Sequence, residues 1–373
     1  MLSTFKNVHA PITMKKTILL ISFILASFSI LLHAQQPEAQ RLIQEGVTLH
    51  DDGKFKEAIE KYNEALKHEP KSMQAIYESS LSYLALQDFK NAVKYSTIVI
   101  KSNDKQLSSG AYAVKSEALV EMDRTDEAIK LLQDGLKENG DEYLLHFNMS
   151  LNYYKKGDAE KAFNHVKKAI DLDKTHSGAF LLYAYLLNDK GLWVQSVLSF
   201  QMFLLLEPDS KRSKNAFEEM LLTMRIKKKS APVKRSFIQQ QMMRDLPDST
   251  LLSSDVPPLS TEEGLNRKIV YDVITNTLDS LRITPAEEDE YTQFKSVNRE
   301  MMNVLEKESK ETREGIFWTF YIPFFTHIKE STFYDTFCRY ISVSYYPQSM
   351  EWWQQNRVSA SNFVNWFENG DNI

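Results

Sequence analysis

Four side chains near the C-terminus have the types that a thiol hydrolase needs. His327, Glu330, Asp335 and Cys338 offer a general base, two carboxylates and a nucleophile within a short stretch of chain. Cys338 follows directly after Phe337 in an aromatic stretch, where a lone cysteine is usually a small buried apolar residue. We therefore expect no catalytic residues and a non-enzymatic protein. A hydrolase in the C-terminal part is the alternative.

The composition excludes several other kinds of site. With one cysteine, the chain forms no intrachain disulfide and no four-cysteine zinc site. Its 11 glycines include no pair at the spacing of a nucleotide-binding loop, and its histidines lack the helical pair of a zinc protease. We expect neither a cofactor nor a metal. The 50 acidic residues outnumber the 45 basic ones, and this net charge of -5 argues against a nucleic-acid partner.

The N-terminal residues have the pattern of a secretion signal. Met14 and two lysines precede an uncharged apolar run over 17–32, and Ala34 stands just before a polar stretch. We expect residues 1–34 to be a signal peptide cleaved near Ala34, with Met14 as a possible true start. The protein is then exported to the periplasm or outside a bacterial cell. The alternative is an uncleaved helix that anchors the chain, because the apolar run is slightly shorter than a bilayer span.

A pattern with a period of about 34 residues recurs five times over residues 39–210. A small residue in the second half of each unit marks it, at Ala58, Ala92, Ala128, Ala162 and Ser196. Another small residue stands twelve positions before each marker, at Gly46, Ser80, Ser116, Ser150 and Ala184. Apolar residues at helical spacing accompany both positions. Since two helices approach closely only where small side chains meet, each unit is expected to be a helix hairpin.

These positions resemble the signature of the tetratricopeptide repeat family. The first unit matches it best, with Leu42, Gly46, Leu49, Gly53, Phe55, Ala58, Tyr62, Ala65 and Pro70. The resemblance implies an all-α fold in which the hairpins stack into a right-handed solenoid with a concave side. The expected repeats are 39–72, 73–106, 109–142, 143–176 and 177–210. Together with a capping helix over 213–225, they make up a domain of residues 35–226.

The resemblance also implies that the first helix of each hairpin lines the concave surface. Residues fifteen, eleven and eight positions before each marker then face it. We expect a partner-binding groove formed by Ile43, Val47, Tyr77, Leu81, Leu84, Val120, Phe147, Leu151, Tyr154, Leu181 and Tyr185. No Lys or Arg occupies these positions, so the clamp with which some family members grip a terminal carboxylate is missing. An apolar groove fits a hydrophobic segment of a protein or peptide. The alternative is that another part of the same chain fills it.

The second half of the chain differs in composition from the repeats. Residues 225–235 hold six positive charges, which could contact an anionic surface or simply complement the dipole of the preceding helix. A linker rich in Pro, Ser and Asp is expected over 227–263. Residues 264–373 are expected to form a smaller helical domain with a dense aromatic core, whose family the sequence does not indicate. Its rings could alternatively line a pocket for a sugar, a peptide or an apolar ligand.

The sequence thus predicts an exported, non-enzymatic scaffold. It would bind an apolar or aromatic segment of a protein partner through the concave groove of its repeats. A hydrolase or carbohydrate-binding module in residues 264–373, delivered by the repeats, is the alternative function.

Overall fold

The computed structural model of the chain is helical throughout its described part. It describes residues 38–227, 265–283, 290–309 and 314–368. These residues form helices and no strand, which confirms the all-α class. The expected signal peptide and all but the first residue of the expected linker lie outside the described residues. No helix within the described part is both long enough and apolar enough to cross a membrane.

The chain divides into two compact units. Unit 1 covers Met1–Leu131 and unit 2 covers Leu132–Ile373. The division falls within one helix, α7 (Thr125–Asn139).

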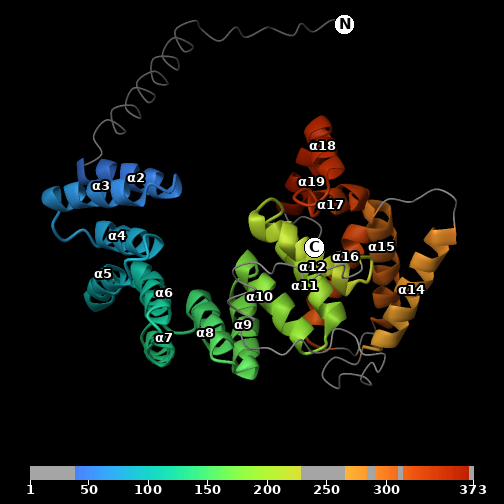
Figure 1. Cartoon of the computed structure of the whole chain (residues 1–373), viewed down its shortest axis with the longest axis horizontal. Coiled ribbons are helices and arrows are strands. Elements are labelled where there is room, and N and C mark those ends of the chain that lie inside the picture. The colour runs from blue at the N-terminus through green and yellow to red at the C-terminus, as the bar shows by residue number, and fades with distance from the viewer. Residues whose placement is uncertain (1–37, 228–264, 284–289, 310–313, 369–373) are drawn as a thin grey trace, which may run out of the picture. The chain divides into compact units, whose positions relative to one another are not determined.

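Unit 1 is built from successive helix hairpins (Figure 1). Its helices are α2 (Glu38–Asp51), α3 (Phe55–His68), α4 (Met73–Ala85), α5 (Phe89–Ser102), α6 (Lys105–Glu121) and the first half of α7. Aspartates cap two of them: the Asp88 carboxylate accepts from the Asn91 N–H at 3.2 Å, and that of Asp104 accepts from the Gln106 N–H at 3.0 Å. Gly53, with φ of 77°, makes the tight turn between α2 and α3.

The repeat markers of unit 1 lie where the two helices of each hairpin meet. Ala58, Ala92 and Ala128 have no solvent exposure. Gly46 is required for close packing in the first hairpin, because a Cβ on this residue would overlap the ring of Tyr62, which is itself fully buried. The small residues therefore set the distance between the paired helices.

Unit 2 continues with two complete hairpins and a single helix. These are α8 (Tyr143–Lys155) with α9 (Ala159–Leu172), α10 (Ser177–Asp189) with α11 (Trp193–Leu206), and α12 (Lys211–Thr223). In both hairpins a serine at one of the two small positions hydrogen-bonds the partner helix. Ser150 Oγ donates to the Ala162 carbonyl at 2.7 Å, and Ser196 Oγ donates to the Ala184 carbonyl at 2.8 Å. A serine thus fits the narrow contact and satisfies its own hydroxyl there.

The C-terminal part of unit 2 is also helical. A five-residue π-helix, η1 (Phe317–Tyr321), runs directly into α16, and Pro323 stands in the first turn of α16. The α-helices are α14 (Arg267–Ile283), α15 (Glu290–Glu308), α16 (Ile322–Glu330), α17 (Tyr334–Tyr340), α18 (Pro347–Gln355) and α19 (Arg357–Glu368). Large rings fill their core; Phe294, Phe325, Phe337 and Phe363 are all fully buried.

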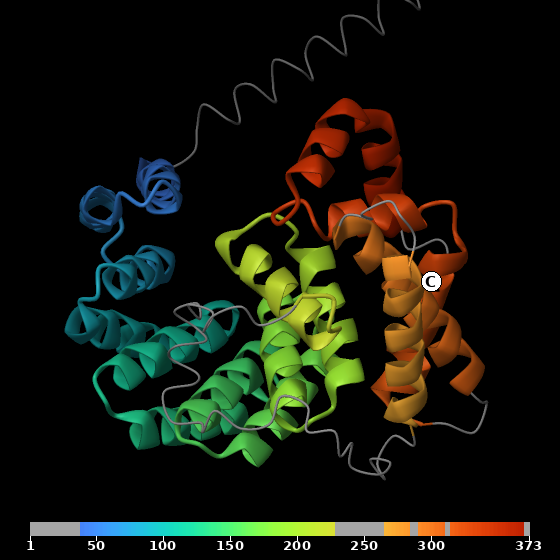
Figure 2. The ribbon, with the colours of Figure 1, turned by 45° about the vertical axis from the view of Figure 1, so that its right-hand side comes forward.

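These C-terminal helices pack against α11 and α12 (Figure 2). Two buried hydrogen bonds join them to α11: Gln201 Nε2 donates to Asn298 Oδ1 at 2.7 Å, and the Ser199 and Tyr321 hydroxyls lie 3.2 Å apart. The ring of Phe217 on α12 meets that of Phe294, with centroids 5.0 Å apart. Helix α12, expected to be an outer cap, therefore lies between the last hairpin and further helices.

Helix α11 is enclosed as a result. Every residue from Trp193 to Leu205 is buried, so this helix has no solvent face over that span. A helix that is apolar on all sides must be covered on all sides. Here α10, α12 and the C-terminal helices provide that cover.

Candidate functional site

The first helices of unit 1 form the surface on which a groove is expected. Helix α4 packs against both α2 and α6, so the three lie side by side. Of the predicted groove residues on them, Val47, Tyr77, Leu81 and Leu84 are half-buried and thus partly open to solvent. We call the surface of α2, α4 and α6 that carries Val47, Leu81 and Leu84 the unit 1 face.

Two other predicted groove residues of unit 1 are not on an open surface. Ile43 is 1% exposed and packs in the core of the first hairpin with Tyr62. Val120 is 8% exposed and packs with Leu119 and Ala128. Both side chains stabilise the fold rather than offer a contact to a partner.

Two of the predicted groove rings contact the next repeat along the chain. The hydroxyl end of Tyr77 lies so close to Gly110 that a Cβ on this glycine would overlap it. In unit 2 the Cζ atom of Phe147 lies 3.2 Å from the position of a Cβ on Gly178, and its ring is 4.5 Å from that of His176. Both glycines stand eighteen residues before a repeat marker. A ring from one repeat thus packs on a glycine at the same position of the following repeat.

In unit 2 three more predicted groove residues are buried: Tyr154 and Tyr185 are each 7% exposed and Leu181 is 4% exposed. The Tyr154 hydroxyl donates to Asp189 Oδ2 at 3.0 Å, and the Tyr185 ring meets Phe200 edge-on at 5.2 Å. Of the other two residues, Leu151 and Phe147 are half-buried. The expectation of a bare apolar stripe thus fails in unit 2, because these side chains pack against the fold itself.

Polar side chains lie among the apolar residues of the unit 1 face. His50 Nδ1 and Ser82 Oγ are 2.7 Å apart, which links the end of α2 to the last turn of α4. Desolvation by burial, followed by the negative charge of Asp51, raises the pKa of Glu78. The Glu117 side chain reaches solvent, yet enough protein surrounds it that desolvation and then Glu121 raise its pKa too. The face is therefore apolar with desolvated carboxylates.

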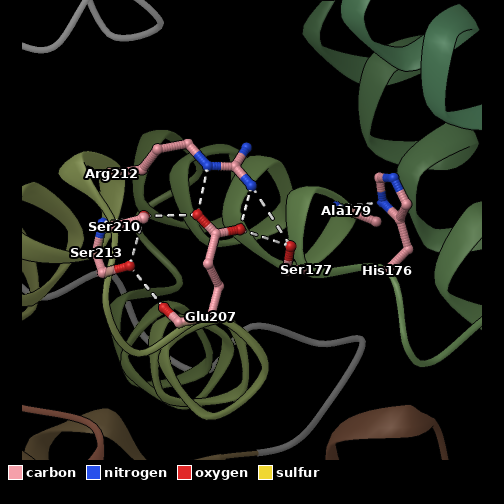
Figure 3. A network of polar contacts seen from close by, with 7 residues as sticks. All are labelled: His176, Ser177, Ala179, Glu207, Ser210, Arg212 and Ser213. Atoms are coloured by element: carbon pink, nitrogen blue, oxygen red, sulfur yellow. Dashed lines mark hydrogen bonds and ion pairs between the residues drawn. The ribbon is translucent and has the colours of Figure 1, made fainter. Parts of the chain in front are cut away.

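The most extensive polar network described in unit 2 has a structural role (Figure 3). Glu207, after α11, accepts hydrogen bonds from Arg212, from Ser210 Oγ at 2.6 Å and from Ser177 Oγ at 2.9 Å. Burial alone would raise the pKa of Glu207, but these hydrogen bonds outweigh it and lower the pKa to about 2. The network ties the start of α10 and the start of α12 to the end of α11.

Two histidines meet across the fourth hairpin. His146 Nδ1 on α8 and His165 Nδ1 on α9 are 2.9 Å apart, and Asp141 Oδ1 lies 3.3 Å from His146 Nε2. Lys168 in turn pairs with Asp141 at 2.9 Å. Across the described residues, no group of three or more His, Cys, Asp or Glu side chains could hold a metal ion. We interpret the pair as a hydrogen bond that joins the two helices.

The histidine and the cysteine of a possible thiol enzyme have separate environments. Cys338 is fully buried, and burial raises its pKa to about 12, so it is an unreactive thiol at neutral pH. His327 stacks on Trp366 with ring centroids 5.4 Å apart, and Asp335 pairs with Lys295 at 3.3 Å. None of the contacts found in the described part of the chain brings the histidine to the cysteine.

The basic segment at 225–235 is described only at its start. The Arg225 guanidinium lies 4.2 Å from the ring centre of Tyr271, and Lys227 Nζ donates to the Tyr345 hydroxyl at 2.7 Å. Lys227 also pairs with Glu218. These two cations therefore serve packing within unit 2, while residues 228–235 lie outside the described residues.

Stacked helix hairpins with small residues at their contacts define a helical repeat protein. A sequence model of the Tetratricopeptide repeat matches residues 144–176, which correspond to the hairpin of α8 and α9. This match confirms the resemblance, and the chain contains a tetratricopeptide repeat segment. Such repeats build scaffolds for protein–protein interaction, and proteins that contain them bind protein or peptide partners.

Known proteins are similar to parts of this chain. DnaJ homolog subfamily C member 3 of Gallus gallus is 24% identical over 158 residues, or 38% of this chain. The chain spans about a third of that relative, 31% of its length. Among solved structures, a thermophilic TPR protein of Thermus thermophilus is 22% identical with a TM-score of 0.45; the match covers 49% of this chain and 99% of the other. PilW, a type IV pilus biogenesis factor, is 14% identical with a TM-score of 0.42, over 57% of this chain and 96% of its own.

Proposed function

We propose that this protein is an exported, non-enzymatic scaffold that binds an apolar segment of a protein partner on the unit 1 face. The observation that carries the proposal is the set of Val47, Leu81 and Leu84, which remain partly open to solvent on neighbouring first helices. Most of the other predicted groove residues are buried or pack on a neighbouring repeat, and Leu151 is half-buried. Apolar side chains left open on adjacent helices favour a hydrophobic partner, since burying them releases water.

The absence of an enzymatic role is supported by the state of the best nucleophile. Cys338 has no solvent exposure and a raised pKa, so substrate could neither reach it nor be attacked by a thiolate. Repeats that act as scaffolds fit this interpretation. A hydrolase in the C-terminal helices therefore has no observation in its favour.

The binding proposal is tested by making the face polar at two half-buried positions. Val47→Asn with Leu81→Asn makes the face polar, and Ile98→Asn makes a like change on α5, where Ile98 is 39% exposed. Proteins that copurify with the full chain should be lost with the double variant and retained with Ile98→Asn. Far-UV circular dichroism checks that both variants keep their helices. Equal capture by all three proteins would remove the face from the proposal.

Export is tested separately by fractionating bacterial cells that produce the full-length chain. We expect the protein in the periplasm or medium, with an N-terminus near Gln35 by N-terminal sequencing. Recovery in the membrane fraction with residues 1–34 still attached would support the anchored alternative. Recovery in the cytoplasm would contradict export.

A further inference from the structure

We propose that the segment bound by the unit 1 face carries basic as well as apolar side chains. This inference rests on the proposed function and assigns the chemistry of the partner. Its basis is that carboxylates are interleaved with the apolar residues of the face. The occupant we infer is a segment of another protein in which Lys or Arg alternates with large apolar residues.

Helix geometry places the acidic groups beside the apolar ones. Asp51 stands four residues after Val47 on α2, and Glu78 three residues before Leu81 on α4, so each pair shares one side of its helix. The contact of His50 with Ser82 brings the end of α2 to α4. Asp51 is close enough to Glu78 to act on its charge, which places the acidic groups of the two helices near one another.

The third helix of the face adds another acidic pair. Glu117 and Glu121 stand four residues apart on α6, and their charges repel. Because α6 packs against α4, these carboxylates continue the acidic part of the face. Three helices therefore contribute acidic side chains to one surface.

Cations near the acidic residues of these helices are few, and on α6 Lys105 stands twelve residues before Glu117. Helix α4 contains no Lys or Arg at all. Arg41 on α2 is held by Glu38 and Glu45. On α6, Lys115 stands two residues before Glu117 and so points to a different side of the helix. In the ion pairs found among the described residues, neither Glu78 nor Glu117 takes part. Their raised pKa values agree with carboxylates that are desolvated and lack a cation.

Charge decides what the face can accept. A purely apolar ligand would cover Glu78 and Glu117 and leave both carboxylates buried without a cation, which opposes binding. An acidic ligand would be repelled. A segment with Lys or Arg between its apolar residues covers the leucines and also pairs the carboxylates, and the attraction speeds its association.

The experiment uses a defined probe. A fluorescein-labelled peptide of about twelve residues with alternating Leu and Lys is titrated with the full chain at pH 7, and binding is followed by fluorescence anisotropy. Two further peptides carry Gln or Glu in place of Lys. We expect the Lys peptide to bind at least tenfold more tightly than the Gln peptide and the Glu peptide not to bind. Equal binding of the three peptides would overturn the inference.

Matched variants locate the effect on the face. Glu78→Gln with Glu117→Gln should weaken the Lys peptide about tenfold, because two charge pairs are lost. Glu57→Gln with Glu60→Gln removes the same charge from exposed positions on α3 and should change binding less than twofold. Equal weakening by both double variants would mean a non-specific attraction and would overturn the inference.

Further variants separate the alternatives. Binding of all peptides that survives Val47→Asn with Leu81→Asn would refute the proposed function, whereas failure of the acidic variants alone would refute only the partner chemistry. The chain also contains its own basic and apolar run at 228–238. If the Lys peptide binds only after Lys228, Lys229, Lys234 and Arg235 are changed to Gln, the occupant is this run and the external partner is excluded.

Discussion

Acidification should weaken unit 2 through the histidine pair of the fourth hairpin. Since Asp141 faces His146 Nε2, that nitrogen donates to the carboxylate, and His146 Nδ1 accepts from the Nδ1–H of His165. The His165 ring also stacks on Tyr153, with centroids 5.5 Å apart. Burial, and then the nearby His146, lower the pKa of His165 to about 4. Protonation of His165 adds a proton at Nε2 and keeps the hydrogen bond from Nδ1, but it places a positive charge on a desolvated ring beside His146, which destabilises the folded state.

The size and direction of the effect follow from that pKa. In the unfolded chain His165 takes up a proton near its ordinary value of 6.5, well before the folded protein does so near 4. The stability from the neutral ring is complete above pH 6.5, is lost as the pH falls from 6.5 to 4, and changes little below. The full loss corresponds to roughly 3 kcal/mol, of which about 2 kcal/mol should be gone by pH 5.

Urea unfolding followed by tryptophan fluorescence measures this loss. All five tryptophans lie in unit 2, together with His165, so the signal reports that unit alone. The free energy of unfolding is compared at pH 7.5 and pH 5.0 for the natural chain, for His165→Gln, and for Asn164→Gln as an exposed control on the same helix.

The difference between the proteins isolates His165 from other titrating groups. The natural chain and Asn164→Gln should each lose about 2 kcal/mol more than His165→Gln on going to pH 5.0. If His165→Gln loses as much stability as the natural chain, the histidine does not titrate as argued and the reasoning is refuted.

Three further predictions concern packing and reactivity. Glu207→Gln should lower the free energy of unfolding by about 2 kcal/mol at neutral pH, measured by urea unfolding. Because the pKa of Glu207 in the folded protein is about 2, this difference from the natural chain should shrink as the pH falls from 4.5 toward 2. A difference that does not change with pH would contradict the prediction. Gly110→Ala, normally stabilising within a helix, should instead lower stability by about 1–3 kcal/mol because the new Cβ meets Tyr77. Far-UV circular dichroism should show much of that loss recovered on adding Tyr77→Leu, whereas additive losses would mean the two residues do not touch. Cys338 should not react with a thiol reagent in the folded protein and should react fully in urea; rapid reaction without urea would contradict its burial.

The repeats could be predicted because their signal is local and periodic. The small residues at the hairpin contacts, such as Gly46 and Ala58, recur at fixed positions, and each hairpin forms from neighbouring residues. The exposed residues of the groove were harder to predict, because a stripe of apolar residues on a helix does not indicate which neighbouring element covers it. The glycines at 110 and 178 were a usable signal, because each offers space for a ring of the preceding repeat and so covers part of Tyr77 and of Phe147.

The packing of the C-terminal helices could not be predicted from local sequence patterns. The hydrogen bond between Gln201 and Asn298 joins residues 97 positions apart, and the sequence around either residue does not indicate the other as its partner. The sequence of α11, WVQSVLSFQMFLLL, does indicate additional packing. It has apolar residues on every side of the helix, and a single hairpin partner could not cover them all. The contact of His146 with His165 likewise cannot be predicted until α8 and α9 are known to pair.

The enclosure of α11 also limits how this repeat array can grow. In an open array, the last hairpin offers a flank on which another hairpin, or the first hairpin of a second molecule, can settle. Here that flank is taken up by α12 and the C-terminal helices. The array is therefore closed at this end: it can neither be lengthened by duplicating its final repeat nor polymerise head to tail through it.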